Sequence, residues 1–285
     1  MTEQRELPSD TPRIDASAGD PECLIGMSSS RGTRPSGPLW FGVALMLTST
    51  IWLLVSFFPE SRVNHVLTRS WTNFASIGLA VWCILLLLMK LVKIRIQRRA
   101  FAVRDIFPTR RDWVLSPGTA PEVLQHIRAM VDRPREFTLF NRVWIALSNL
   151  GNIGEARDVG AVLDSQAHAD SAHVDAGYTA LRVLIWTIPV MGFIGTVIGL
   201  GQAIGSFQNV LDATGGESAS AIKDRLGPVV SGLATKFDTT LVALLATVVV
   251  QLLTTWVYSL EEDFLADAQA YCHENIVARL KLVDW

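Results

Sequence analysis

The sequence predicts an all-α integral membrane protein with four transmembrane helices and a helical cytoplasmic collar. The chain of 285 residues is 49% hydrophobic and 18% charged, which is more apolar than a typical soluble domain. Four uncharged runs each approach or exceed the roughly 20 residues that a helix needs to cross a bilayer. Such lengths rarely occur together in one soluble chain. The runs are Leu39–Phe58, Trp71–Met89, Val183–Leu211 and Thr239–Leu260.

The segment before the first run is expected to be a disordered cytoplasmic tail. Residues 1–38 are rich in Pro, Ser, Gly, Asp and Thr and lack an apolar period, a composition that cannot bury a core. We expect no signal peptide, because the first apolar run begins only at Leu39 and is long enough to span.

The Lys and Arg distribution predicts the orientation of the four spans. Basic residues gather directly after the second run, whereas the loops 59–70 and 212–225 carry two each. Basic loops stay on the cytoplasmic side, so both termini are predicted to be cytoplasmic. A cluster of this kind can also bind anionic lipid, although topology alone accounts for it. The cluster consists of Lys90, Lys93, Arg95, Arg98, Arg99 and Arg104.

The spans and the segments between them divide the chain into five parts. These are the tail 1–38, a first hairpin 39–92, a cytoplasmic helical segment 93–180, a core pair 181–260 and a C-terminal cytoplasmic helix 261–285. In the cytoplasmic segment, Pro121 marks a helix start and Pro134 a break. The apolar pattern of 155–178 predicts an amphipathic helix that can continue into the third run, and the pattern of 266–280 extends the fourth run in the same way.

The third run carries glycines where a simple anchor would carry leucines. Gly195 with Gly199, and Gly201 with Gly205, form two small-xxx-small pairs that let helix backbones approach closely in lipid. With 100° of rotation per residue, several small residues point to within about 60° of one common direction, so they form one face of the helix. Its members are Pro189, Gly192, Thr196, Gly199 and Ala203. We therefore expect this helix to pack against neighbours.

The fourth run carries a polar stripe. Its members fall within about 40° of Thr240, and they are Thr240, Thr247, Gln251 and Thr254. Threonines in lipid often bond to their own helix carbonyls. Four aligned polar groups opposite a small-residue helix instead favour a hydrated internal wall.

Two charged residues at the start of the fourth run have alternative interpretations. If the span is centred on Thr240, Lys236 and Asp238 are buried at bilayer depth and form a gate or an intersubunit ion pair. If the span begins at Thr239, they are its outer flank. Charges at bilayer depth cost about 2.5 to 3.5 kcal/mol each on insertion scales.

The remaining motifs do not indicate an enzyme, a cofactor or a metal. Gly199, Gly201 and Gly205 spell GxGxxxG inside an apolar run, not at a strand-to-helix turn. Ser206, Ser231, Asp238 and His273 lack a nucleophile elbow. The three cysteines show no CxxC pairing, and the histidines at 126, 168 and 173 share no metal-ligand spacing. The net charge of -2 predicts no nucleic-acid role, because no basic face exceeds the cluster that follows the second run.

Two segments carry a resemblance to a known family. GFIGTVIGLGQAIGSF and GLATKFDTTLVALLATVVVQ resemble the paired core helices of the MotA/TolQ/ExbB proton-channel family. The resemblance assigns Thr196 and Thr240 to the positions of the two core threonines of that family. Four spans are similar to MotA, whereas the core motif is closer to ExbB and TolQ. The Ala-Ile-Pro that follows the second threonine in the family is absent, since residues 246–249 read ATVV.

The resemblance implies a subunit of an ion-driven motor in the bacterial inner membrane. It implies five copies around a dimer of a single-span MotB/TolR/ExbD-like partner whose membrane aspartate carries the ion. The residues support the need for a partner independently, because a threonine hydroxyl does not titrate and the third and fourth runs contain no carboxylate. The expected ion is H⁺; Thr239 beside Thr240 adds an oxygen that could coordinate Na⁺. A membrane scaffold that recruits a cytoplasmic protein and a secondary transporter protomer are the alternatives.

Overall fold

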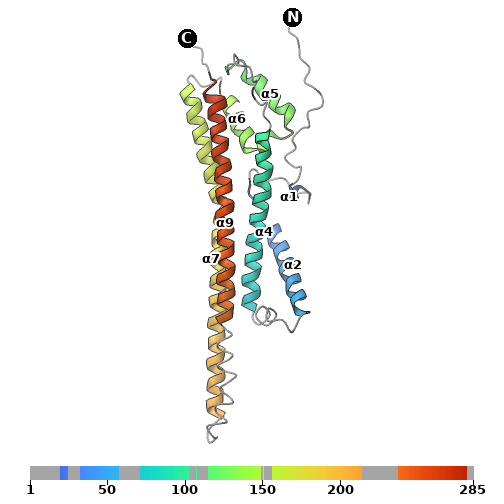
Figure 1. The fold of residues 1–285 in the computed structure, drawn as a ribbon, viewed down its shortest axis with the longest axis vertical. Coiled ribbons are helices and arrows are strands. Elements are labelled where there is room, and N and C mark those ends of the chain that lie inside the picture. The colour runs from blue at the N-terminus through green and yellow to red at the C-terminus, as the bar shows by residue number, and fades with distance from the viewer. Residues whose placement is uncertain are drawn as a thin grey trace. The chain divides into compact units, whose positions relative to one another are not determined.

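The computed structural model describes residues 20–24, 33–57, 71–102, 107, 115–148, 150, 156–213 and 237–280. These residues are mainly helical (Figure 1), and no β-strand occurs among them apart from a single bridge between Leu115 and Leu280. Within the described ranges, four helices are long and apolar enough to cross a membrane. The predicted class, an all-α protein with four membrane-spanning helices, is confirmed.

The four long helices contain the four apolar runs. They are α2 (Gly37–Ser56), α4 (Trp71–Arg98), α7 (Ala156–Ala213) and α9 (Phe237–Cys272). The third run and the amphipathic segment before it form one uninterrupted helix, α7, although Pro189 lies inside it. The fourth run likewise continues through α9 into a π-helical turn, η4 (His273–Val277). Both predicted continuations are confirmed.

Short helices occupy the segment between α4 and α7. They are η1 (Arg99–Ala102), α5 (Ala120–Met130), η2 (Pro134–Glu136) and α6 (Thr138–Ser148). Pro121 lies in the first turn of α5, where its missing N–H costs no hydrogen bond. The helix ends before Pro134, as predicted, and buries Val123 and Ile127 on one face.

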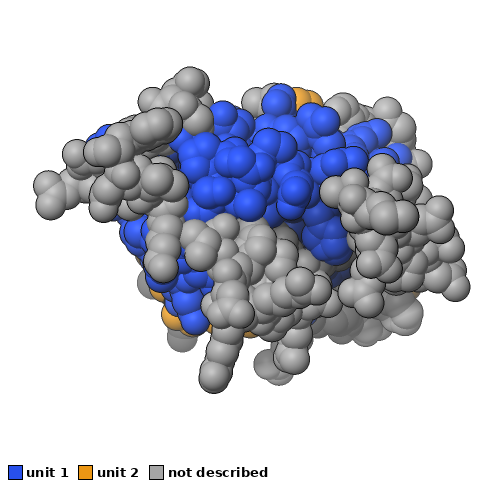
Figure 2. Space-filling model, turned by 90° about the horizontal axis from the view of Figure 1, so that it is seen from above, with its two compact units in different colours: residues 1–36, 89–177, 257–285 blue, residues 37–88, 178–256 orange. Residues whose placement is uncertain are grey.

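The chain divides into two compact units, which are coloured separately in Figure 2. Unit 1 comprises residues 1–36, 89–177 and 257–285, and unit 2 comprises residues 37–88 and 178–256. The predicted segments 93–180 and 261–285 therefore belong largely to one unit. Its core joins α5 and α6 to the last turns of α9, with Phe101 stacked edge-on against Phe264 at 5.7 Å between ring centroids.

Part of the N-terminal tail is ordered, which differs from the predicted disorder of 1–38. Residues 1–19 and 25–32 lie outside the described residues, but Pro21–Leu24 form one helical turn, α1. The carboxylate of Glu22 is 2.5 Å from the Lys93 ammonium, and both residues are buried. The expectation of disorder is wrong here because composition does not reveal a charged partner about 70 residues away along the chain.

In unit 2, aromatic side chains join α2 to α4. The rings of Phe41 and Trp82 meet edge to face at 4.7 Å, and those of Trp52 and Phe74 at 5.1 Å. A Cβ added at Gly78 would lie 3.6 Å from the Thr48 methyl. The first two spans therefore form a packed hairpin.

Candidate ion-conducting site

The helices α7 and α9 run side by side (Figure 1) and approach closely at Gly192. A Cβ added at Gly192 would lie 2.5 Å from the Cβ of Ala243 and 3.2 Å from the Cα of Thr240. Contacts this short are not tolerated, so only glycine permits this helix separation. The predicted role of Gly192 in helix packing therefore has a direct geometric basis.

Thr196 and Thr240 lie together beside this contact. The Thr240 hydroxyl donates to the Gly192 carbonyl at 3.1 Å and is 3.4 Å from the Thr196 hydroxyl. Thr196 donates its own hydrogen to the Phe193 carbonyl at 2.7 Å, so its oxygen can accept the single Thr240 hydrogen as an alternative to the Gly192 carbonyl. Both side chains remain partly exposed. The structure thus brings together the two threonines that the sequence singled out.

A second group of hydroxyls surrounds Gly195. A Cβ there would collide with the Thr72 hydroxyl of α4 and would lie 3.2 Å from the hydroxyl oxygen of Thr239. Thr72 and Thr239 are buried, with 1% and 4% of their surface exposed. Gly195 therefore admits polar side chains from two neighbouring helices.

Sequence reasoning missed the polar residues of α4. Thr72, Asn73 and Ser76 are all buried in unit 2, and the Ser76 hydroxyl has no hydrogen-bond partner among the described residues. Their spacing places them near one another on the first turns of the helix. The helical spacing of these polar residues, at the beginning of the second apolar run, is the sequence feature that could have identified them.

The rest of the predicted stripe on α9 behaves differently from Thr240. The hydroxyls of Thr247 and Thr254 each donate at 2.7 Å to carbonyls of their own helix, those of Ala243 and Val250. Gln251 is exposed. Thr247 and Thr254 thus make the hydrogen bonds of the alternative interpretation, in which threonines bond back to their own helix.

The remaining predicted site residues differ in how deeply they are buried. Gly199 is buried, whereas a Cβ at Gly201 or Gly205 would meet no atom of the described residues within 4 Å. Asp238 lies partly exposed in the first turn of α9, where a carboxylate faces the positive end of the helix dipole. Lys236 lies outside the described residues.

Unit 1 contains a buried ion pair that the sequence did not predict. The Lys90 ammonium lies 2.9 Å from a Glu261 carboxylate oxygen, and both side chains are almost completely excluded from solvent. Thr33 donates to the other oxygen of Glu261. The sequence places Lys90 in the basic cluster that predicts topology, and it does not reveal this pairing because the glutamate lies 171 residues away along the chain.

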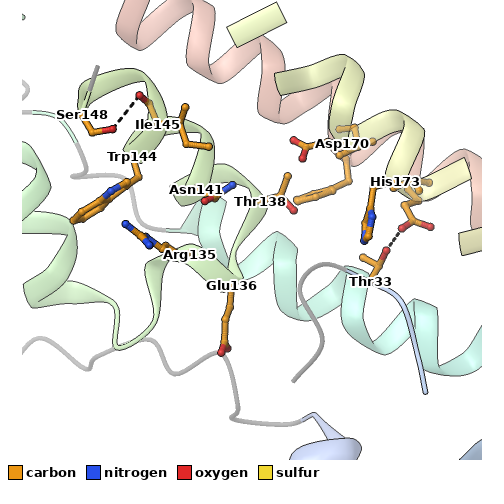
Figure 3. Close-up of a pocket in the computed structure, with 14 residues that line it drawn as sticks. Thr33, Arg135, Glu136, Thr138, Asn141, Trp144, Ile145, Ser148, Asp170 and His173 are labelled. Carbon is orange, nitrogen blue, oxygen red and sulfur yellow. Dashed lines mark hydrogen bonds between the residues drawn. The ribbon is translucent and has the colours of Figure 1, made fainter. Parts of the chain in front are cut away.

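Unit 1 also contains a cavity of about 520 Å³ (Figure 3). Arg135 lies near Trp144 at one side, with its guanidinium 5.6 Å from the ring centroid. His173 and Asp170 of α7 line another part, and Asp170 accepts from the buried Arg142 at 2.6 Å. The lining therefore carries both signs of charge.

These features define a multi-pass, all-helical membrane protein whose last two spans pack through glycine and share a threonine pair. Residues 145–265, which include α7 and most of α9, match the sequence profile of the MotA/TolQ/ExbB proton channel family. The matched segment covers less than half of the chain, and over it the chain is similar to this proton channel family. Searches of curated proteins and of solved structures gave no match.

Proposed function

We propose that this protein is the ion-conducting subunit of a membrane motor in the bacterial inner membrane. Five copies surround a dimer of a single-span MotB/TolR/ExbD-like partner, both termini are cytoplasmic, and H⁺ passes through the complex, with Na⁺ as the alternative ion. The family match over both core helices supports the channel class. The partner, the stoichiometry, the orientation and the ion are proposals.

The observation that carries the proposal is the Thr196–Thr240 pair. The two hydroxyl oxygens are 3.4 Å apart on different helices and both side chains are partly exposed on the protomer. A hydroxyl can donate and accept, so an exposed pair offers polar groups to a neighbouring carboxylate or ion. Around it, the exposed side chains of α7 and α9 are mainly large and apolar, including Phe193, Val197 and Leu241.

The proposal requires a titratable group from another chain. Neither 183–211 nor 239–260 contains a carboxylate, and the hydroxyls of Thr196 and Thr240 stay protonated at physiological pH. Asp238 lies two residues before Thr240 in α9, but it is about 160° round the helix from it. A proton carrier beside the threonine pair must therefore come from a partner, and a carboxylate within hydrogen-bonding reach of the pair is the simplest one.

The register between α7 and α9 supports a functional role for Asp238. Thr240 lies beside Thr196, which is near the middle of the apolar run 183–211. Asp238, two residues earlier on α9, is thus level with the middle of that run. This register favours the interpretation in which Asp238 lies at bilayer depth, where it would contribute to a gate.

The test is ion flux through complexes that carry Thr196→Val or Thr240→Val. Valine keeps the shape of threonine but removes the hydroxyl, so assembly with the partner should survive while flux falls several-fold. Thr255→Val is the matched control, because the Thr255 hydroxyl is exposed and donates to its own helix at Gln251. Flux is measured in proteoliposomes under separate pH and sodium gradients.

Two results would contradict the assignment. If both valine variants assemble and conduct like the parent under either gradient, the hydroxyl pair is only a structural contact. If Thr255→Val lowers flux as much as Thr240→Val does, the effect is a general one of removing threonine hydroxyls from α9. A loss confined to the sodium gradient would identify Na⁺ as the ion.

A further inference from the structure

Three helices of unit 2 meet at Gly195 of α7. The hydroxyl of Thr72, on α4, occupies the space that a side chain at Gly195 would need, and the hydroxyl oxygen of Thr239, on α9, would lie 3.2 Å from a Cβ added there. Thr72 and Thr239 are 1% and 4% exposed, and Gly195 is buried as well. These three residues form a buried contact between α4, α7 and α9, which we call the inner trio.

The Thr196–Thr240 pair directly follows two members of the inner trio along the chain. Thr196 comes after Gly195 on α7, and Thr240 comes after Thr239 on α9, so each threonine is turned by about 100° from the residue before it. Both threonines of the pair are partly exposed. The rotation of each helix about its axis therefore determines at once where its trio residue and its pair residue point.

The contact between the paired hydroxyls depends closely on the rotation of α9. The hydroxyl oxygen of Thr240 is 3.4 Å from that of Thr196, whereas O–H···O hydrogen bonds in proteins are about 2.5 to 3.0 Å long. A small further rotation would thus separate the two hydroxyls beyond hydrogen-bonding reach. The inner trio opposes such a rotation, because its buried atoms are closely packed and cannot shift without disturbing their neighbours.

We propose that Thr72 is a positioning residue for the threonine pair: its hydroxyl, within the inner trio, holds α9 in the rotation that places Thr240 against Thr196. Thr72 acts through the pair and does not itself face an ion path, since it is buried. The inference rests on the proposed function, because it concerns the same pair. It goes beyond the likeness to the proton channel family, which covers residues 145–265 and does not include α4.

A disulfide between the paired positions reports their register without any ion conduction. The test uses the full-length chain with its three native cysteines replaced by alanine and with Thr196→Cys and Thr240→Cys introduced. Mild oxidation should link the two thiols, because a disulfide requires side chains as close as these. We expect Thr72→Ala to lower the rate of linkage several-fold. Thr72→Ser should retain the rate, because it differs from Thr72→Ala only by the hydroxyl. Mass spectrometry of the linked peptides measures the rate.

Two further variants separate the proposed role from a general loss of buried hydroxyls. Thr239→Ala removes the α9 member of the inner trio and should lower the rate of linkage as Thr72→Ala does, so the test does not depend on the folding of one variant. Ser76→Ala is the matched control. It removes a hydroxyl of α4 that is also buried and has no hydrogen-bond partner among the described residues, and it should leave the rate unchanged.

The outcomes distinguish this inference from the proposed function. The inference is wrong if Thr72→Ala links at the parental rate, or if Thr72→Ser or Ser76→Ala loses as much as Thr72→Ala does. A cysteine pair that does not link even with Thr72 present would contradict the threonine contact, and with it the inference. Ion flux should fall in Thr72→Ala complexes and return with Thr72→Ser. If linkage falls while flux stays unchanged, Thr72 positions the pair but the pair does not conduct, which contradicts the proposed function alone.

Discussion

At the scale of single residues, the α7–α9 contact depends on the absence of a side chain at two glycines. An added Cβ at Gly192 would overlap Ala243, and one at Gly195 would overlap Thr72. Ala243 and Thr72 are themselves buried, so neither can move aside without disturbing a further neighbour. The same reasoning does not apply to Gly201, because a Cβ added there would meet no described atom within 4 Å.

Gly192→Ala should therefore destabilise the protein, although alanine is the better helix former. Overpacking costs about 1 to 3 kcal/mol, which exceeds the roughly 1 kcal/mol that alanine gains in helix propensity. We expect a lower midpoint of thermal unfolding for the purified protein in detergent. Gly201→Ala is the matched control and should leave the midpoint unchanged or raise it slightly. Equal midpoints for Gly192→Ala and the parent would refute the close-packing argument.

At the scale of elements, a buried ion pair joins α4 to α9 in unit 1. Lys90 and Glu261 are 1% and 0% exposed, and a Cβ at Gly177 of α7 would lie 3.5 Å from the Lys90 nitrogen. Gly177 thus leaves room for the ammonium beside α7. Removing one partner leaves a buried charge uncompensated, whereas removing both does not.

Lys90→Met should accordingly destabilise unit 1 by about 3 to 5 kcal/mol, because the buried Glu261 carboxylate would lose the ammonium that lies 2.9 Å from it. The double variant Lys90→Met with Glu261→Met should recover much of this loss. Chemical denaturation of the four proteins of this double-mutant cycle measures the coupling. Additive losses in the two single variants would mean that the pair contributes no interaction energy.

At the scale of the whole molecule, the contact between Ser36, Glu22 and Lys93 constrains the topology. It brings the beginning of α2 and the end of the second apolar run to the same site, as in a membrane hairpin with both ends on one side. The Lys and Arg excess after the second run predicts that this side is cytoplasmic.

Reporter fusions test this orientation. Fusions after Arg99 and after Lys281 should both report a cytoplasmic location, and one near Gly216 should report an external location, as the basic residues require. A cytoplasmic signal at Gly216 would overturn the four-span topology, and an external signal at Arg99 would invert it.

The sequence by itself determined the features that depend on neighbours along the chain. Apolar run length predicted four spans, the 3.6-residue period predicted that the third and fourth runs continue as amphipathic helices, and the polar and small faces identified Thr196, Thr240 and Gly192. Each of these signals is complete within one helix, because side-chain direction follows from the helical repeat.

Only the tertiary structure decided which helices meet and in what register. The pairing of Lys90 with Glu261, of Glu22 with Lys93 and of Gly195 with Thr72 depends on contacts between segments far apart in the sequence. A helical pattern shows which face is polar, but it does not show which helix that face contacts. The three threonines lie on one stripe of α9, yet Thr240 bonds to Gly192 of α7 whereas Thr247 and Thr254 bond to their own helix. The stripe alone does not reveal this difference, for the same reason.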